Sequence, residues 1–187
     1  MQSTDEAART LRVSAIRSPS AGPPPRAFPL KGRERPSQSA MLPLMKPFWE
    51  TKSLAEMSEA EWESLCDGCG RCCLVVLEDD KGRYYETDVA CRLFDAGERR
   101  CTDYRGRHKR VPDCVRLTAE NAGALAWMPE SCAYRRLARG QSLPDWHPLI
   151  TGDPDSVRRA GAAVRADVES EAGVADEELE GRVTGRR

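Results

Sequence analysis

Four cysteines lie within eight residues of this chain, in the order Cys66, Cys69, Cys72 and Cys73. Four more follow singly, at Cys91, Cys101, Cys114 and Cys132. Two residues between cysteines allow both sulfur atoms to reach one ion, and zinc and iron–sulfur centres commonly take four thiolate ligands. The spacing therefore predicts a metal centre in which all eight cysteines are candidate ligands.

The way in which these thiols share metal stays open. Cys72 and Cys73 are adjacent, and neighbouring side chains usually point apart, so one mononuclear site cannot easily use all four clustered sulfurs. Either one sulfur bridges two ions, or the cluster feeds two sites, or it holds a polynuclear iron–sulfur centre. Eight thiolates match two four-sulfur zinc sites, one iron–sulfur cluster with spare thiols, or one of each.

Two other interpretations compete with metal binding, namely buried cysteines that only pack and a disulfide framework. Residues 1–9 contain no apolar stretch behind a basic start, so they do not resemble a secretory signal, and we expect a cytoplasmic location. The aliphatic run at 74–77 is far too short to span a membrane. Thiols in a reducing cytoplasm stay reduced unless a metal binds them, which favours metal.

The overall composition indicates one domain with a small core. Aromatic residues make up 6% of the 187 residues and the mean hydropathy is −0.61, so we expect the fold to need stabilising cross-links or metal. The net charge of −1 creates no field that would draw the chain to nucleic acid. The basic run 105–110 is interpreted as a solvated loop rather than a phosphate contact. A metal ion is the expected partner, and no protein partner is indicated.

Proline and serine are concentrated at the start of the chain. This composition predicts that residues 1–44 are a disordered extension, or an upstream stretch of a reading frame that begins at Met41 or Met45. Residues 45–187 are predicted to form the cysteine-cluster metal-binding domain.

Local patterns place short elements around the cysteines. A capping box at 58–61 predicts a helix over 59–65 that ends at Cys66. Residues 74–87 predict a β-hairpin with its turn at 79–82. Further helices are predicted over 118–127, over 132–139 with Ser131 as its cap, and at Asp176, and 144–154 is predicted as a loop. The predicted fold class is a small α+β domain, mostly short helices with one β-hairpin, organised around a cysteine-rich metal centre.

Arginines near the cysteines have two interpretations of equal weight: they balance the charge of a metal centre, or arginine simply outnumbers lysine throughout this chain. Four thiolates around Zn²⁺ leave a net charge of −2, which nearby cations and N–H donors must stabilise. Six arginines lie close to a cysteine in the sequence: Arg71, Arg92, Arg99, Arg100, Arg135 and Arg136. His147 is a less favoured ligand candidate than the cysteines, because a packed loop histidine is the preferred interpretation of this residue.

Several segments together resemble a known family. They are 48–50, 61–74, 89–92, 112–114, 127–129, 132–135 and 146–149. The chain resembles the YcgN-type bacterial proteins of the wider YkgJ cysteine-cluster group over about 47–183. The resemblance implies a small cytoplasmic protein with a zinc- or iron-chelating domain. Members often carry a Cys-x-Cys pair where this chain has Arg99 before Cys101, so Arg99 replaces a ninth thiol and eight candidate ligands remain.

The sequence therefore predicts a metal-binding cysteine-cluster protein that chelates zinc or iron through clustered thiolates. An iron–sulfur redox protein or enzyme, and an interaction adaptor that needs metal to fold, are the alternatives. The sequence contains no phosphate-binding glycine loop and no nucleophile elbow. Since a reactive cysteine cannot be told from a metal ligand by sequence, whether the protein is an enzyme stays open.

Overall fold

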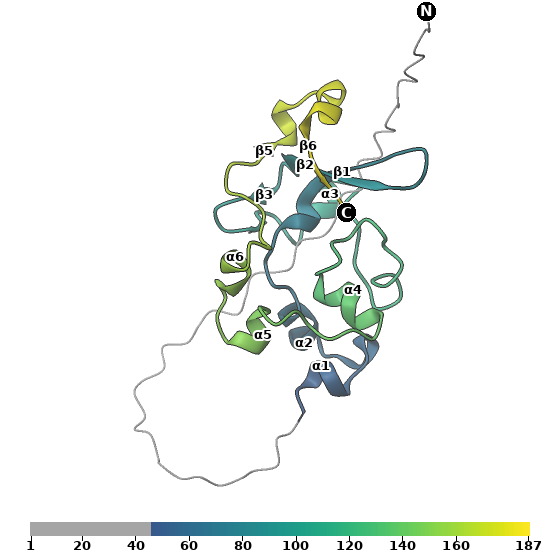
Figure 1. Cartoon of the computed structure of the whole chain (residues 1–187), viewed down its shortest axis with the longest axis vertical. Helices are drawn as coiled ribbons and strands as arrows, with labels where there is room; N and C mark the ends of the chain where they lie inside the picture. The colour runs from purple at the N-terminus through teal and green to yellow at the C-terminus, as the bar shows by residue number, and fades with distance from the viewer. Residues whose placement is uncertain (1–45) are drawn as a thin grey trace, which may run out of the picture.

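The computed structural model describes residues 46–187, so the extension predicted over 1–44 lies outside the described residues. Short helices and two small sheets make up the fold, which confirms the small α+β class (Figure 1). The α-helices are α1 (Phe48–Thr51), α2 (Glu59–Ser64), α3 (Arg107–Arg110), α4 (Ala133–Ala138), α5 (Pro148–Thr151) and α6 (Ser156–Arg159). The 3₁₀ helices are η1 (Leu54–Glu56), η2 (Arg71–Cys73), η3 (Glu171–Gly173) and η4 (Asp176–Arg182). The strands are β1 (Leu74–Glu78), β2 (Tyr84–Ala90), β3 (Phe94–Asp95), β4 (Arg100–Cys101), β5 (Glu169–Ser170) and β6 (Val183–Arg186).

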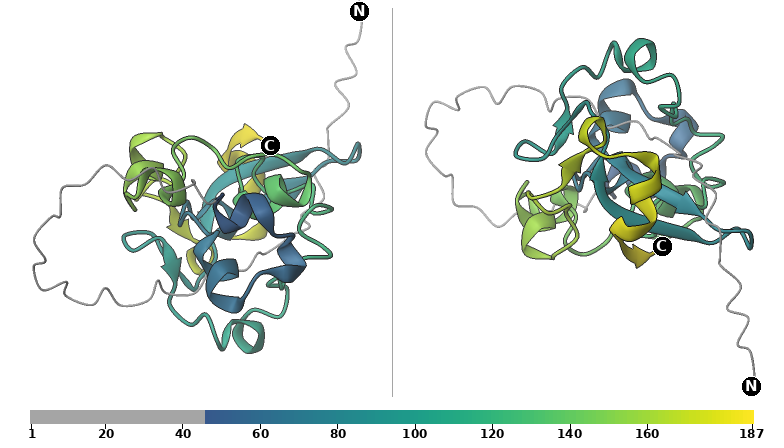
Figure 2. Two further views of the ribbon diagram at one scale, coloured as in Figure 1. Left: turned by 90° about the horizontal axis from the view of Figure 1, so that it is seen from below. Right: turned by 90° about the horizontal axis from the view of Figure 1, so that it is seen from above.

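Strand β2 is the centre of the main sheet. It pairs antiparallel with β1, which confirms the predicted hairpin. Its other edge is shared, because β6 pairs antiparallel with its first half and β5 pairs parallel with its end. Figure 2 shows this late segment, in yellow, against the hairpin. Strands β3 and β4 form a separate two-stranded antiparallel sheet, so the predicted fold with one hairpin contained too few strands.

A buried threonine supplies a hydrogen bond to the backbone where the register of the hairpin is irregular. The β1–β2 register shifts between Leu74 and Val76, as at a β-bulge. The Thr87 hydroxyl is fully buried and donates to the Val75 carbonyl at 2.8 Å. The bulge therefore leaves the Val75 carbonyl with a hydrogen-bond partner, as a buried backbone group requires.

Within residues 46–187, the apolar interior is divided among four small clusters instead of one large core. Alternating residues of β1 face opposite ways, so Val75 and Leu77 join one cluster while Val76 joins another with Trp127. A third cluster holds α2 against α4 and includes Leu65. The fourth is built on 93, 111 and 114. This division agrees with the weak core expected from the composition.

The capping box of α2 forms as predicted. Ser58 accepts a hydrogen bond from the Glu61 backbone, and the Glu61 carboxylate accepts one from the Ser58 backbone at 2.8 Å. Glu61 also pairs with Lys52 at 2.7 Å. At the other end of the helix, the Tyr134 hydroxyl donates to the Trp62 carbonyl at 2.8 Å and joins α2 to α4. Helix α2 therefore ends at a fixed place, directly before Cys66.

The predicted helix over 118–127 was wrong, because this segment forms turns. Thr118 and Asn121 form a capping box, in which each side chain accepts a hydrogen bond from the backbone N–H of the other residue. The backbone bonds that follow, such as Ala122 to Thr118 and Ala124 to Asn121, close single turns and not a continuous helix. The predicted helix over 132–139 is α4, but Cys132 occupies its N-cap position and the Ser131 hydroxyl has no partner among the described residues. The predicted loop over 144–154 contains α5.

Candidate metal centre

The clustered cysteines lie on a tight loop between α2 and β1. Two glycines, Gly68 and Gly70, take left-handed backbone conformations with φ of 66° and 75°. They turn the chain back after Cys66 and lead into η2, which carries Cys72 and Cys73. The loop thereby presents four thiols between the end of a helix and the start of a buried strand.

Four of the eight thiols influence one another electrostatically, and we call them the loop set: Cys66, Cys69, Cys72 and Cys132. Burial raises the pKa of Cys66 and of Cys69 well above the usual value, and the charges of neighbouring thiols add to the rise. Burial also raises the pKa of Cys132 to about 12. Cys132 reaches this group from the start of α4, 59 residues beyond the clustered segment's last cysteine. In the loop set Cys69 is buried and the other three thiols are partly buried, and a metal ion bound there would have to displace the thiol protons.

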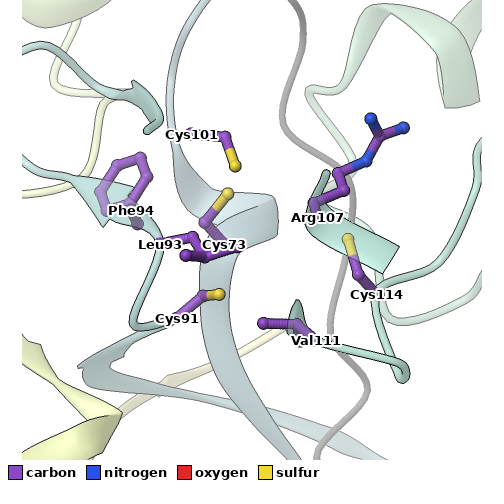
Figure 3. A pocket seen from close by; sticks show the side chains of 8 residues that line it. All are labelled: Cys73, Cys91, Leu93, Phe94, Cys101, Arg107, Val111 and Cys114. Atoms are coloured by element: carbon purple, nitrogen blue, oxygen red, sulfur yellow. The ribbon is translucent and has the colours of Figure 1, made fainter. Parts of the chain in front are cut away.

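The other four thiols line one small cavity, and we call them the cavity set: Cys73, Cys91, Cys101 and Cys114 (Figure 3). The cavity volume is about 10 Å³, which is room for roughly one water-sized body. The Cys91 backbone N–H donates to the Cys73 carbonyl at 2.8 Å, which fixes the end of β2 beside η2. Cys101 ends β4, and Cys114 follows α3. Four separate segments thus bring one thiol each to the same cavity.

The two sets meet at the Cys72–Cys73 peptide bond. A side-chain hydrogen bond with Cys73 is the largest cause that raises the pKa of Cys72. All eight cysteines are reduced thiols, outside any disulfide. Across residues 46–187, no three cysteine, histidine or carboxylate side chains already stand in a metal-binding arrangement. A shared ion therefore requires rotation of these short side chains about their Cα–Cβ bonds.

The donor chemistry of both sets fits a metal ion. Each set has a buried arginine beside it whose Nε–H group has no hydrogen-bond partner in the described structure, Arg107 for the cavity set and Arg135 for the loop set. The positive charge of Arg107 opposes the rise in pKa that burial causes at Cys114. A buried N–H donor without a partner is costly, and a thiolate sulfur would satisfy it. Eight soft thiol ligands with these neighbours suit zinc or iron.

Arg107 was missed by the sequence interpretation, which assigned 105–110 to a solvated loop. The residue is only 9% exposed, donates to the Tyr104 carbonyl and stacks 3.8 Å from the centre of the Tyr104 ring. Only its place in a basic run was visible in the sequence, and burial cannot be read from that. Arg110, in the same basic run, is exposed and forms an ion pair with Asp103 at 2.9 Å.

Of the six arginines expected near the metal, only Arg135 is buried. The other five bind partners elsewhere. Their partners are Glu86 for Arg71, Glu171 for Arg92, Asp155 for Arg99, Glu98 for Arg100 and the Ser142 carbonyl for Arg136. Proximity in the sequence was therefore a poor guide to which arginine faces a thiol.

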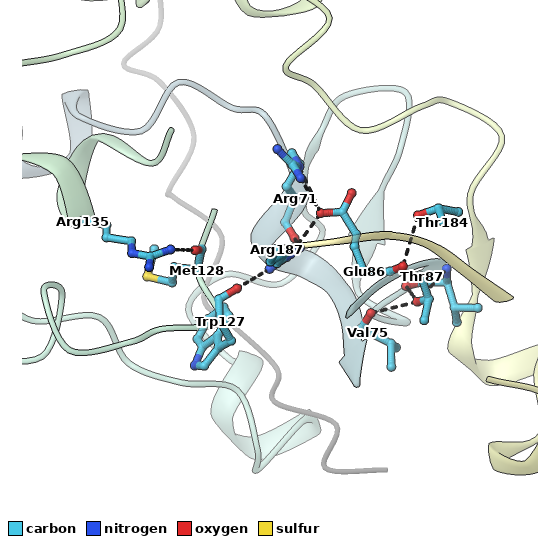
Figure 4. Close-up of polar contacts among 10 residues, drawn as sticks. Arg71, Val75, Glu86, Thr87, Trp127, Met128, Arg135, Thr184 and Arg187 are labelled. Carbon is cyan, nitrogen blue, oxygen red and sulfur yellow. Dashed lines mark hydrogen bonds and ion pairs between the residues drawn. The ribbon is translucent and has the colours of Figure 1, made fainter. Parts of the chain in front are cut away.

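Arg187 occupies a place that the sequence did not indicate. Its side chain is 1% exposed and donates to the Trp127 carbonyl at 2.7 Å and to the Glu86 carboxylate at 3.0 Å (Figure 4). Its guanidinium also donates to the Arg71 carbonyl, on η2. The charge of Arg187 lowers the pKa of Cys72 and so opposes the other effects on that thiol. The end of β6 therefore brings a second cation to the loop set.

His147 is not available as a ligand in this arrangement. Its Nε2 lies 3.0 Å from the Leu65 carbonyl oxygen, and its Nδ1 accepts a hydrogen bond from the Leu149 backbone at 3.1 Å. The ring is fully buried, and burial lowers its pKa. His147 therefore fixes the end of α2 against α5, in agreement with the packed-histidine interpretation.

A polar carboxylate lies inside the loop set. Asp67 is 8% exposed, and its Oδ1 accepts a hydrogen bond from the Cys69 backbone at 2.9 Å. Its Oδ2 is buried and has no hydrogen-bond partner among the described residues. The sequence interpretation did not include Asp67, although its place between two clustered cysteines was a visible signal.

Within residues 46–187, none of the helices has both the length and the apolar character needed to cross a bilayer. A comparison with solved structures gave no match.

Comparison with protein families connects the cysteines to metal. Residues 65–133, which include all eight cysteines, match the CxxCxxCC family, described as a "Putative zinc- or iron-chelating domain". The chain is 54% identical to a UPF0260 protein of Rhodopseudomonas palustris (strain BisA53), over 80% of this chain and 86% of the relative. It is 58% identical to one from Caulobacter vibrioides (strain NA1000 / CB15N), over 71% of this chain and 83% of the relative. Because such identity extends over most of each relative, the chain belongs to the UPF0260 protein family.

Proposed function

We propose that this protein chelates zinc or iron through all eight cysteines, arranged as two neighbouring four-thiolate centres. The observation that carries the proposal is the division of the thiols into the loop set and the cavity set. Four thiolates complete the usual coordination of zinc, and eight complete two such ions. The proposal assigns the adjacent Cys72 and Cys73 to different centres, so the hydrogen bond between their side chains would break when metal binds.

The proposal assigns this activity to residues 45–187, in a reducing compartment such as the cytoplasm, where thiols remain available to metal. The narrower assignment to the YcgN type within the YkgJ group forms part of the same proposal. When bound, a zinc ion would supply structural cross-linking, since each set joins segments that are far apart in the chain. Arg107 and Arg135 would orient N–H donors toward thiolate sulfur and offset its charge.

The test is the metal content of protein purified without oxygen. The full chain should contain about two zinc or iron ions, as four-thiolate coordination requires. Cys69→Ser should remove the metal of the loop set and Cys101→Ser that of the cavity set, so each variant should retain about half. The double variant should retain none.

The two single variants serve as controls for each other, because each leaves one set intact. A full chain that folds without metal would overturn the proposal, and so would single variants with unchanged content. Loss of all metal from either single variant would show one shared centre instead of two. Inorganic sulfide and a brown colour would identify iron–sulfur chemistry in place of simple ions.

A further inference from the structure

We infer that Asp67 is an oxygen ligand of the metal held by the loop set, through its Oδ2 atom. This inference rests on the proposed function and deepens it, because it makes the two centres chemically different. The carboxylate oxygen would be added to the four sulfurs of the loop set and make that centre five-coordinate, whereas the cavity set would keep four sulfur ligands.

Asp67 is held in place within the cysteine loop. It lies between Cys66 and Cys69, and its Oδ1 accepts a hydrogen bond from the Cys69 backbone N–H at 2.9 Å. This bond fixes the side chain against the backbone of the loop. The second carboxylate oxygen is then buried beside the thiols, with no hydrogen-bond donor among the described residues.

Burial of Asp67 Oδ2 without a partner is costly. A carboxylate removed from water needs a cation or several N–H donors, and Oδ2 of Asp67 has neither in the described structure. An ion bound among the neighbouring thiols would remove this penalty.

The balance of charge in the loop set also favours a bound ion. Four thiolates and one carboxylate carry five negative charges. A divalent ion together with the guanidinium groups of Arg135 and Arg187 would offset four of them. These two arginines interact electrostatically with Cys132 and Cys72, respectively. The loop set therefore has the neighbouring cations that a mixed sulfur and oxygen site requires.

The test uses the full chain carrying Cys101→Ser, so that the remaining metal belongs to the loop set. Asp67→Asn in this background keeps an Oδ1 acceptor for the Cys69 backbone and removes the anionic oxygen. We expect its affinity for Zn²⁺, measured by competition with a chromogenic chelator, to fall roughly 10-fold or more. Asp79→Asn is the matched control, because Asp79 also accepts from a backbone N–H two residues on, at 2.9 Å. It lies at the far end of β1, and its substitution should leave Zn²⁺ affinity unchanged.

A second measurement does not depend on the folding of the Asp67→Asn variant. X-ray absorption at the zinc edge of the Cys101→Ser protein should show sulfur at about 2.3 Å together with an oxygen neighbour at about 2.0–2.2 Å. A shell of sulfur alone, or an Asp67→Asn protein with unchanged affinity, would overturn the role of Asp67 and leave the proposed function intact. A full chain without any metal would instead overturn the proposed function, and this inference with it.

Discussion

At Gly70 the backbone turns through a left-handed conformation directly beside the ring of Phe94. A Cβ added at Gly70 would lie 2.5 Å from Cζ of that ring, whereas a Cβ at Gly68 would meet nothing within 4 Å. Both glycines have a positive φ, so an alanine at either position carries a similar backbone penalty. The difference in stability between the two alanine variants therefore reports the contact between the cysteine loop and Phe94 of β3.

Gly70→Ala should therefore be the more damaging of the two substitutions. We expect Gly68→Ala to lower the free energy of unfolding by about 1–2 kcal/mol through backbone strain. Gly70→Ala should cost roughly 1–3 kcal/mol more, because Phe94 must shift to make room. Urea unfolding of both variants measures the difference, and equal losses would show that the Phe94 contact has no energetic weight.

The sequence identified all eight cysteines as candidates but could not divide them. The grouping depends on η2, which sends two adjacent thiols to different sets, and on long-range contacts that bring in Cys91, Cys101 and Cys114. Burial was equally hidden. Nothing in the composition separates Arg107, which faces a thiol, from exposed arginines in the same run.

Among the elements, those defined by local chemistry were predictable. The capping box of α2 and the alternating hairpin of β1 and β2 each contain their own signal within a few residues. The segment 118–127 has an apolar pattern and a capping box at Thr118 and Asn121, which suggest a helix, yet it forms only turns and the local sequence does not explain why. Strands β5 and β6 have two and four residues and form only because β2 is already in place, so the local sequence has no pattern that predicts them.

The α2 capping box should give stability that depends on pH. The hydrogen bond from Lys52, followed by that from the Ser58 backbone, lowers the pKa of Glu61 from 4.5 to about 2. A carboxyl group with a lowered folded-state pKa stabilises the fold fully above its unfolded value. That contribution is then lost as the pH falls from about 4.5 toward about 2.

Glu61→Gln should therefore be less stable than the natural chain at pH 7, and the gap should close below pH 4. Chemical unfolding of both proteins across this pH range provides the measurement. Glu59→Gln is the control, because Glu59 lies in the same first turn of α2 but outside the capping box. A gap between the natural chain and Glu61→Gln that stays constant with pH would contradict this account of the cap.

At the scale of the whole molecule, the cysteines lie at the borders of the apolar clusters. Cys66 and Cys132 pack against the α2–α4 cluster, and Cys132 also packs with Cys72 against the cluster that contains Trp127. Cys114 belongs to a third cluster, with Cys91 and Cys101 packed against it. Metal bound by the loop set would therefore join two of these small clusters, and metal bound by the cavity set would cross-link the third.

Removing metal should for this reason destabilise the whole domain and not only the loop. An ion present at about 1,000 times its Kd stabilises a fold by about 4 kcal/mol, and two such ions by about twice that. At about 2–4 °C for each kcal/mol, a chelator under reducing conditions should lower the Tm by roughly 15–30 °C. The double variant Cys69→Ser and Cys101→Ser is the control, because it should already melt low and should not respond to the chelator. An unchanged Tm in the natural chain after its metal has been removed would mean that the four clusters suffice without it.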